Sequence, residues 1–313
     1  MAREASRSEA QLGALSAEFR ARLLPNLGIE SVLCDSTTPS RVRGVEAATL
    51  ALQSAGITGK QLGLIVDFTS LAEDASSLGS LSHHVQHELQ ASHAQVFGIR
   101  GAGCCGFHVA LSLVQSIFRS NADLNFALMV ASDRANDAGR MCLPVSIMAD
   151  ASSAIVLARP ELVSRRLGCV RAVMTQTSGR FSEVISADPA TRTVNIDSAI
   201  FETQIVPLHF VMLSRLLERA LKTAGLSRAD IGAVIYPNTT LLDRTSVARA
   251  LGFNQQMLLG PGPRNLGHAF ANDLIINAQP LFQQVRDAQP VHSAWLAAGS
   301  GFTWGAAIID ATQ

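Results

Sequence analysis

The amino-acid sequence predicts an α/β protein made of two pseudo-symmetric halves, and two observations carry this prediction. First, residues 51–69 (ALQSAGITGKQLGLIVDFT) match residues 220–238 (ALKTAGLSRADIGAVIYPN) at 5 of 19 positions. Second, two short apolar segments, residues 125–132 and 292–299, recur at nearly the same offset. A single unit used twice explains both observations, and a chance likeness of one helix-turn-strand unit is the alternative.

Each copy of the repeat has the same expected structure. A helix ends at an Ala-Gly pair, where Gly56 and Gly225 can adopt the left-handed cap conformation, and an apolar strand follows a short polar turn. Helices between the strands imply crossover connections, so we expect mainly parallel pairing in buried sheets. We place the N-terminal half over residues 1–163 and the C-terminal half over residues 164–313.

Composition and charge exclude several classes of protein. The 25 Lys and Arg residues equal the 25 Asp and Glu residues, so no basic excess favours nucleic acid or anionic lipid. The longest apolar runs are too short to cross a bilayer, and residues 1–16 lack the apolar core of a secretory signal. The five cysteines contain no CxxC pair. We therefore expect a cytoplasmic protein with reduced thiols.

A cysteine lies where a strand turns into a helix. The sequence predicts a strand over residues 94–100 and a glycine-rich turn over residues 101–107 (GAGCCGF). An apolar helix is expected to follow and to continue to about residue 119. A thiol at this junction lies beside the first free N–H groups of the helix, whose dipole favours the thiolate. The sequence therefore predicts Cys104 as a nucleophile.

The same turn also matches the G-x-G-x-x-G fingerprint of dinucleotide-binding proteins through Gly101, Gly103 and Gly106. Two thiols occupy the variable positions, where a pyrophosphate needs free backbone, and the motif lies a third of the way along the chain. A nicotinamide or flavin oxidoreductase is thus a weaker alternative, and a purely structural turn is another.

Three ordered motifs resemble those of the thiolase superfamily, and within it the β-ketoacyl-ACP synthase III branch. Residues 103–107 (GCCGF) are similar to its A-C-x-G-F motif, residues 148–154 (MADASSA) to F-G-D-G-A-G-A, and residues 299–305 (GSGFTWG) to G-G-G-x-T-W-G. The resemblance covers about residues 28–313.

This resemblance implies a five-layered αβαβα thiolase fold, a homodimer and an acyltransferase that binds no cofactor or metal. The acyl group would come from acyl-CoA or an acyl carrier protein (acyl-ACP) and be held as a thioester on Cys104. The backbone N–H groups of Cys104 and Ser300 would form the oxyanion hole, and such donors typically contribute a few kcal/mol each.

The chain departs from the branch at two catalytic positions. Synthase III enzymes carry His and then Asn, whereas here Asn238 (in YPNTT) precedes His268 (in NLGHA), an order similar to that of true thiolases. The second cysteine of true thiolases is absent, because residues 298–300 read AGS. We predict a catalytic set of Cys104, His268 as the base, and Asn238 as a neutral donor at the carboxyl end of a repeated strand.

The N-terminal region departs as well. Arg22 and Asn26 stand where the branch has the Trp and Arg of its W-I-x-x-R-T-G-I segment, so the usual adenine-stacking groups are missing. This favours a carrier-protein donor or another mode of coenzyme A binding. It also hints at a specialised, secondary metabolic pathway.

Three further features receive plainer interpretations. His83 and His87 are spaced as a metal-binding pair on a helix, but no third ligand is evident, so a solvated face is favoured. Asp273 lies five residues after His268, and on a helix that spacing would point it away, which favours a structural role. Residues 175–194 are predicted to form a surface loop near an entrance.

The leading functional prediction is an enzyme that loads an acyl group onto Cys104 and passes it to a second substrate with His268 and Asn238. Claisen-type carbon-carbon condensation is slightly favoured by the resemblance, while Asn238 in place of histidine favours acyl transfer to a hydroxyl or amine. A catalytically silent subunit of a ketosynthase heterodimer is the second hypothesis.

Overall fold

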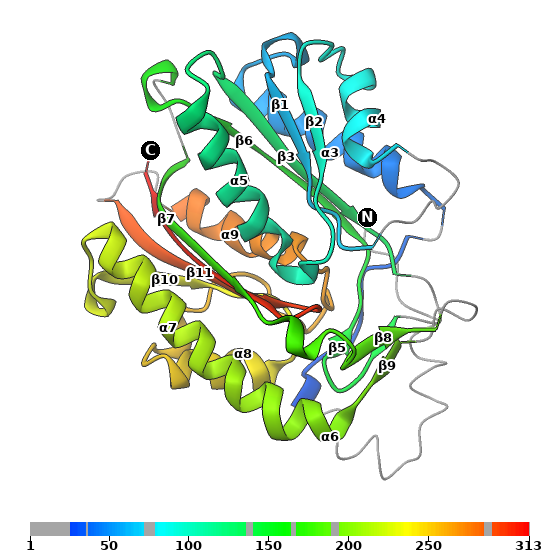
Figure 1. Ribbon diagram of the computed structural model, residues 1–313, viewed down its shortest axis with the longest axis vertical. Coiled ribbons are helices and arrows are strands. Elements are labelled where there is room, and N and C mark those ends of the chain that lie inside the picture. Colours follow the sequence, from blue (N-terminus) through cyan, green and yellow to red (C-terminus); the bar gives the residue numbers. More distant parts are fainter. Residues whose placement is uncertain are drawn as a thin grey trace.

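Two four-stranded sheets enclose a central layer of helices, and further helices cover the outer faces, which gives five αβαβα layers (Figure 1). The architecture is seen in a computed structural model, which describes residues 26–35, 37–71, 79–135, 140–163, 167–188, 194–284 and 290–312. The predicted five-layered α/β fold is confirmed.

The first sheet is formed by strands between residues 64 and 158, in the order β2-β1-β3-β6. Its strands are β1 (Leu64–Asp67), β2 (Gln95–Gly98), β3 (Phe126–Asp133) and β6 (Ala151–Ala158). Its outer face is covered by α3 (Ser40–Ala55) and α4 (Leu81–Glu88).

The second sheet is formed by strands between residues 168 and 311, in the order β10-β11-β12-β7. Its strands are β7 (Gly168–Thr177), β10 (Ile231–Ile235), β11 (Val291–Gly299) and β12 (Thr303–Ala311). Its outer face packs against α7 (Val206–Ala224) and α8 (Leu241–Ala250). A division of the chain near residue 163 stays a prediction.

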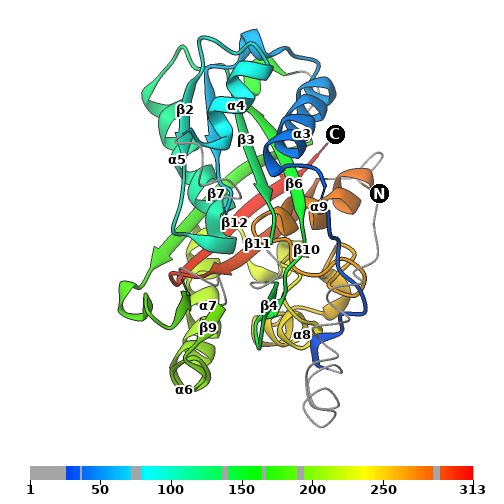
Figure 2. The ribbon, with the colours of Figure 1, turned by 90° about the vertical axis from the view of Figure 1, so that its right-hand side faces the viewer.

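The central layer consists of α5 (Gly106–Ser120) and α9 (Asn272–Gln284). Both helices contact strands of both sheets, and Figure 2 shows them between the sheets in a second view. Phe107 of α5 stacks on Trp295 of β11, with ring centroids 5.3 Å apart. Burial of such large rings stabilises the junction of the two halves, because apolar area removed from water contributes roughly 25 cal/mol per Å².

The repeat predicted from the sequence is present in detail. Helix α3 ends at Gly56 (φ 67°) and α7 ends at Gly225 (φ 70°), both in the left-handed cap conformation. A single 3₁₀ turn follows each helix and carries the same reciprocal side-chain cap, Thr58 with Gln61 and Ser227 with Asp230. The strands β1 and β10 come next, as expected.

The expectation of mainly parallel pairing is only partly right. β1 pairs in parallel with β2 and β3, and β10 pairs in parallel with β11. β6 pairs antiparallel with β3, and β12 pairs antiparallel with both β11 and β7. For the β11–β12 pair the reason is connectivity: β11 passes into β12 through a tight turn rather than a helix, and a tight turn reverses the chain.

Two hairpins and several short turns complete the fold. The hairpins are β4 (Met141–Cys142) with β5 (Ser146–Ile147), and β8 (Ile185–Ala187) with β9 (Val194–Ile196). The shorter helical turns are η1 (Gly59–Gln61), η2 (Gly103–Cys105), η3 (Pro160–Leu162), η4 (Gly179–Phe181), α6 (Ser198–Ile200), the π-helical η5 (Phe201–Ile205), η6 (Arg228–Asp230) and η7 (Gln255–Met257). Residues 175–194 are thus not one loop, because β7, η4 and β8 occupy most of the described part.

Candidate active site

Cys104 lies at the predicted junction of strand and helix. The turn η2 contains it, α5 begins two residues later, and the side chain is half-buried. The neighbouring Cys105 is fully buried, and burial raises the pKa of its thiol well above the usual range, with the charge of Cys104 adding to the effect. Cys104 is therefore the accessible thiol of the pair.

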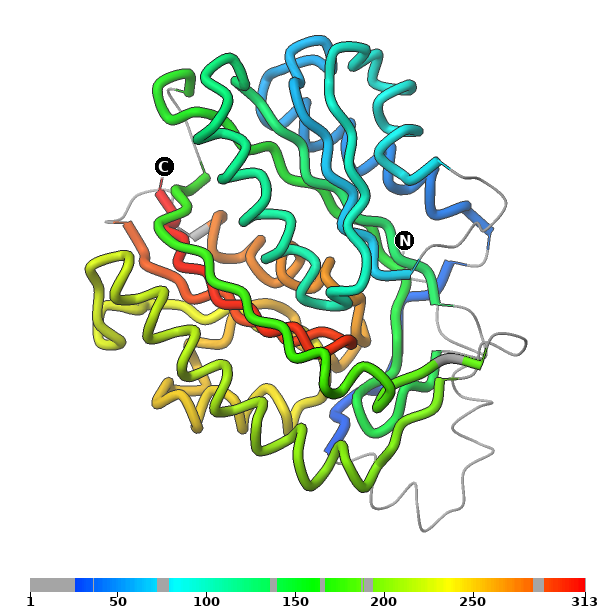
Figure 3. Tube along the Cα trace, viewed as in Figure 1, coloured from blue at the N-terminus to red at the C-terminus, as the bar shows by residue number. Residues whose placement is uncertain are grey.

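The glycines of the turn permit close packing against the turn that follows β11, and Figure 3 shows the two segments side by side. A Cβ on Gly299 would lie 1.9 Å from the carbonyl oxygen of Ala102 and 2.8 Å from the Cys104 nitrogen. A Cβ on Gly103 (φ 51°) would lie 2.6 Å from the Ser300 nitrogen. The backbone N–H groups of Cys104 and Ser300 thus belong to two turns in direct contact.

His268 lies against the thiol. Its Nε2 is 2.9 Å from Cys104 Sγ, although the two residues are 164 positions apart in the chain. The backbone of His268 is held like a strand: its N–H donates to the Ile147 carbonyl (2.9 Å), and its carbonyl accepts from the Ala149 N–H (2.8 Å). The imidazole is fully buried, so the approach of its ring to the thiol is fixed.

Asp273 completes a chain of three groups, and the expectation that it points away from His268 is wrong. His268 Nδ1 lies 2.5 Å from Asp273 Oδ2, and both side chains are fully buried. Helical spacing does not apply, because α9 begins only at Asn272. Gly267 (φ 74°) and Phe270 (φ 55°) take left-handed conformations before it and turn the chain back on itself.

The bond to Asp273 fixes the protonation pattern of the imidazole. An ionised carboxylate only accepts hydrogen bonds, so Nδ1 carries the proton and Nε2 faces the thiol. Burial by itself would lower the pKa of His268, but the negative charges of Cys104 and Asp273 outweigh burial and hold that pKa well above its usual value. The arrangement therefore favours a thiolate paired with an imidazolium.

Asn238 occupies the far side of Asp273 rather than the side of the thiol. Its backbone N–H donates to Asp273 Oδ2 (2.7 Å), and its Nδ2 donates to Asp273 Oδ1 (3.3 Å). Its Oδ1 accepts from Arg244 (3.0 Å) and Asn277 (2.9 Å). The amide reaches Cys104 only through Asp273 and His268, which differs from the neutral donor expected beside the thiol.

Apolar side chains surround the other side of the thiol. Cys104 packs against a cluster that includes Cys142, Met148 and Phe270, with Val194 and Ile196 of β9 at its edge. The β8–β9 hairpin thus packs against the same apolar wall as the nucleophile. Such a wall suits an apolar chain attached to the sulfur, because no charge is desolvated against it.

The remaining predicted features lie elsewhere. His83 and His87 are exposed on α4, and among the described residues no group of three or more His, Cys, Asp or Glu could hold a metal ion. Arg22 lies outside the described residues, and Asn26 is exposed at the start of the described part.

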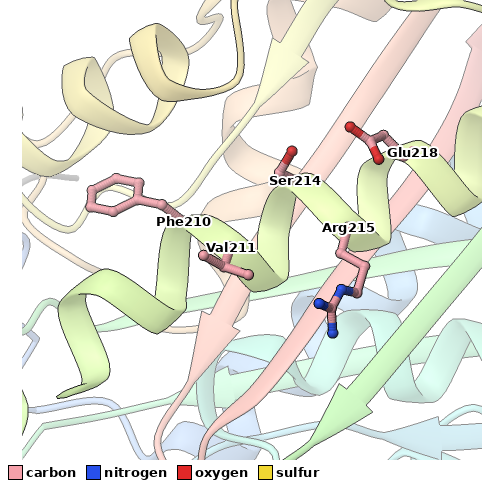
Figure 4. A pocket seen from close by; sticks show the side chains of 5 residues that line it. All are labelled: Phe210, Val211, Ser214, Arg215 and Glu218. Atoms are coloured by element: carbon pink, nitrogen blue, oxygen red, sulfur yellow. The ribbon is translucent and has the colours of Figure 1, made fainter.

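A shallow cavity of about 400 Å³ runs along α7 and is lined by residues from Phe210 to Glu218 (Figure 4). It contains none of the predicted site residues. The helical segment Ser198–Ala224 is the one described helix long and apolar enough to pass for a membrane span. A core helix can pass the same test, so one such segment is weak evidence.

The chain is similar in sequence to proteins that share one name. It is 28% identical to β-ketoacyl-[acyl-carrier-protein] synthase III of Salmonella arizonae over 282 residues, which is 85% of this chain and 82% of that protein. The Escherichia coli O1:K1 protein of the same name is also 28% identical, over 281 residues, with the same coverage. No protein-family model matches the chain.

Solved structures share the fold across nearly the whole chain. ChlB3, an acyltransferase, has a TM-score of 0.84 at 22% identity and covers 100% of this chain and 95% of its own. The 3-oxoacyl-[acyl-carrier-protein] synthase III of Aquifex aeolicus has a TM-score of 0.78 at 19% identity, covering 95% and 91%. Xanthomonas campestris OleA, solved with lauric acid and lauroyl-CoA, has a TM-score of 0.80 at 16% identity, covering 98% and 93%.

These similarities confirm the family resemblance that the three sequence motifs indicated. The relatives are named as acyl-transferring and condensing enzymes, and the solved structures share the fold of this chain. The chain is therefore a thiolase-fold enzyme related to β-ketoacyl-[acyl-carrier-protein] synthase III.

Proposed function

We propose that this chain is an acyltransferase that carries its acyl group as a thioester on Cys104 and passes it to a hydroxyl or amine. One observation carries the proposal: the line of Cys104 Sγ, His268 and Asp273, with separations of 2.9 Å and 2.5 Å. A nucleophile, a base and a carboxylate that orients the base form the arrangement of acyl-transfer triads.

Loading begins with attack of the Cys104 thiolate on the thioester carbonyl of acyl-ACP or acyl-CoA. A new carbon-sulfur bond forms, and the carbonyl oxygen gains a negative charge that the N–H groups of Cys104 and Ser300 stabilise. When the intermediate collapses, the bond to the donor sulfur breaks. His268 gives its Nε2 proton to the departing thiolate, which leaves a neutral imidazole and an acyl-enzyme.

Transfer uses that neutral imidazole. His268 Nε2 accepts the proton of an incoming hydroxyl or amine while the oxygen or nitrogen attacks the thioester carbonyl. The carbon-sulfur bond to Cys104 then breaks, and the thiolate and imidazolium are restored. Asp273 stays ionised throughout and stabilises the imidazolium that forms.

The position of Asn238 favours this acceptor over carbon. Decarboxylative condensation draws on neutral donors to the carbonyl oxygen of the extender unit, and the amide of Asn238 is committed to Asp273, Arg244 and Asn277. Claisen-type condensation is the second candidate, and the names of the curated relatives support it.

Partners follow from the same site and surface. The apolar wall beside Cys104 suits an aliphatic acyl group, and Asn26 in place of an adenine-stacking residue favours acyl-ACP over acyl-CoA as its source.

β2 is an edge strand with Phe97 41% exposed, and we place a homodimer interface there. A cytoplasmic location fits the five free cysteines, and the altered N-terminal segment fits a specialised pathway.

Intact-protein mass spectrometry tests the proposal. Wild-type protein incubated with a panel of acyl-ACP and acyl-CoA donors should gain one acyl mass, Cys104→Ala should gain none, and the matched variant Cys105→Ala should gain the same mass as wild type. Adding hydroxylamine should then release the acyl group as a hydroxamate. A wild-type protein that no donor acylates would instead support a silent subunit, and an acyl mass that persists in Cys104→Ala would refute the assignment.

A further inference from the structure

Arg244 is a buried cation on α8 that the sequence motifs do not include. The residue is only 4% exposed, and its Nη1 donates to the carbonyls of Tyr236 (2.6 Å) and Pro237 (3.2 Å) and to Asn238 Oδ1 (3.0 Å). Its Nη2 donates to the Leu259 carbonyl (3.2 Å). One guanidinium thus holds the whole turn in which Asn238 sits.

The charge of Arg244 has no direct ionic partner in the described part of the chain. Among the residues that the structure describes, its hydrogen bonds go to carbonyl and amide oxygens, and no carboxylate lies within ion-pair distance. Burying a cation without a compensating anion is costly, so such a group needs a charge nearby. Burial lowers the pKa of Arg244, whereas Asp273, Tyr236 and Asp243 oppose that effect.

Asn238 connects this cation to the triad. Arg244 and Asn277 both donate to its Oδ1, so its Nδ2 and its backbone N–H are directed at the two oxygens of Asp273. The groups therefore alternate in charge from Cys104 through His268 and Asp273 to Arg244. The donors that hold Asp273 are thus themselves held in place by Arg244.

We propose that Arg244 is a positioning residue for the Cys104–His268–Asp273 triad, which holds the Asn238 turn against Asp273 and supplies the buried positive charge behind that carboxylate. The inference rests on the proposed function, since it concerns the same triad. Without Arg244 the turn of Asn238 loses its hydrogen bonds to the guanidinium, so Asp273 loses firmly held donors and a nearby positive charge. His268 is then a poorer imidazolium, and less thiolate forms at Cys104.

Alkylation of Cys104 by iodoacetamide tests this, because the thiolate reacts and no acyl donor is needed. The rate is followed by intact mass against pH, with Cys104→Ala as the background from the other cysteines. In Arg244→Met the pH midpoint of the alkylation rate should rise, which slows alkylation about tenfold at pH values below that midpoint. Asp273→Asn should shift the midpoint in the same direction.

Two variants make the test selective. Arg244→Lys keeps the charge but cannot bridge the carbonyls and the amide, so its midpoint should lie between those of wild type and Arg244→Met. Arg159→Met is the matched control, because Arg159 also holds backbone carbonyls, those of Phe118, Asn121 and Leu124, outside the triad. Its midpoint should equal that of wild type.

The outcomes separate this inference from the proposed function. A folded Arg244→Met protein with the wild-type midpoint overturns the positioning role, and if that variant does not fold, an unshifted Arg244→Lys midpoint does the same. Circular dichroism and thermal melting establish which variants fold. Failure of every acyl donor with a shifted midpoint in Arg244→Met would refute the proposed function and leave the positioning role standing.

Discussion

His268 Nδ1 and Asp273 Oδ2 lie 2.5 Å apart across the turn that leads into α9, whose second residue is Asp273. The Ala269 N–H donates to the other carboxylate oxygen at 2.9 Å, so the turn is closed by the same side chain that orients the imidazole. A carboxylate in this place makes the histidine a stronger base toward the thiol than a neutral amide would.

Replacing Asp273 by Asn should lower kcat/KM for acyl loading by roughly 10³- to 10⁴-fold, as removal of the carboxylate does in serine-protease triads. The amide can present its oxygen or its nitrogen to Nδ1 and no longer fixes one tautomer. Asp310→Asn is the control, because Asp310 pairs with Arg171 and His292 on the second sheet and should leave loading unchanged. Equal rates for Asp273→Asn and wild type would remove Asp273 from the triad.

The raised pKa of His268 predicts a flat pH response. Because the charges of Cys104 and Asp273 keep the imidazolium protonated above neutral pH, alkylation of Cys104 should change little between pH 6 and pH 8. His268→Gln removes the counter-ion, so its alkylation rate should rise steeply with pH toward a midpoint near 8.5. A wild-type rate that climbs tenfold per pH unit through this range would contradict the ion pair.

Gly299→Ala should destabilise the protein and disrupt loading. The added Cβ would lie 1.9 Å from the Ala102 carbonyl oxygen, so the turn after β11 must move away from Cys104, at a cost of about 1–3 kcal/mol. Gly179→Ala is the matched control, because nothing lies within 4 Å of its added Cβ. Thermal melting and the loading rate should separate the two variants, and indistinguishable behaviour would contradict the close packing.

Asp133 and His108 should give opposite dependences of stability on pH. Burial raises the pKa of Asp133 to about 7, so the folded state binds more protons between about pH 4 and 7, and stability falls as pH rises. Burial lowers the pKa of His108 to about 4, so the unfolded state binds more protons between about pH 4 and 6.5, and stability falls as pH falls.

Asp133→Asn therefore leaves the effect of His108 unopposed. Urea unfolding should show the free energy of unfolding of this variant dropping more steeply than that of wild type as pH is lowered from 6.5 to 4. His108→Gln should show the reverse, with stability falling as pH rises toward 7. Parallel pH curves for Asp133→Asn and wild type would mean that Asp133 is ionised in the folded protein throughout this range.

Phe97→Glu should convert the proposed homodimer into monomers. The substitution places a charge on the edge strand β2, where a second copy would pair, and a charge buried at an interface opposes association. Leu162→Glu is the control, since Leu162 is 47% exposed in η3, away from that edge. Light scattering after size exclusion measures the mass, and a monomeric wild type would rule out the dimer at these concentrations.

Much of the architecture could be predicted from the amino-acid sequence. The repeated Ala-Gly caps at Gly56 and Gly225 predicted the helix ends, because a helix cap is a local matter of backbone conformation. The glycine-rich turn singled out Cys104 for the same reason. The antiparallel strands were not anticipated, since the partner of a strand depends on connections that periodicity does not report.

The sequence by itself determined the two-fold repeat, the fold class and the two groups that meet at the site, Cys104 and His268. Only the tertiary structure decided that Asp273, and not Asn238, is the neighbour of the imidazole. Left-handed residues before α9 break the helical spacing, and the hydrogen bonds of Asn238 and Arg244 join groups from separate elements. Such pairings depend on how the layers pack, and packing is a property of the whole chain rather than of any segment.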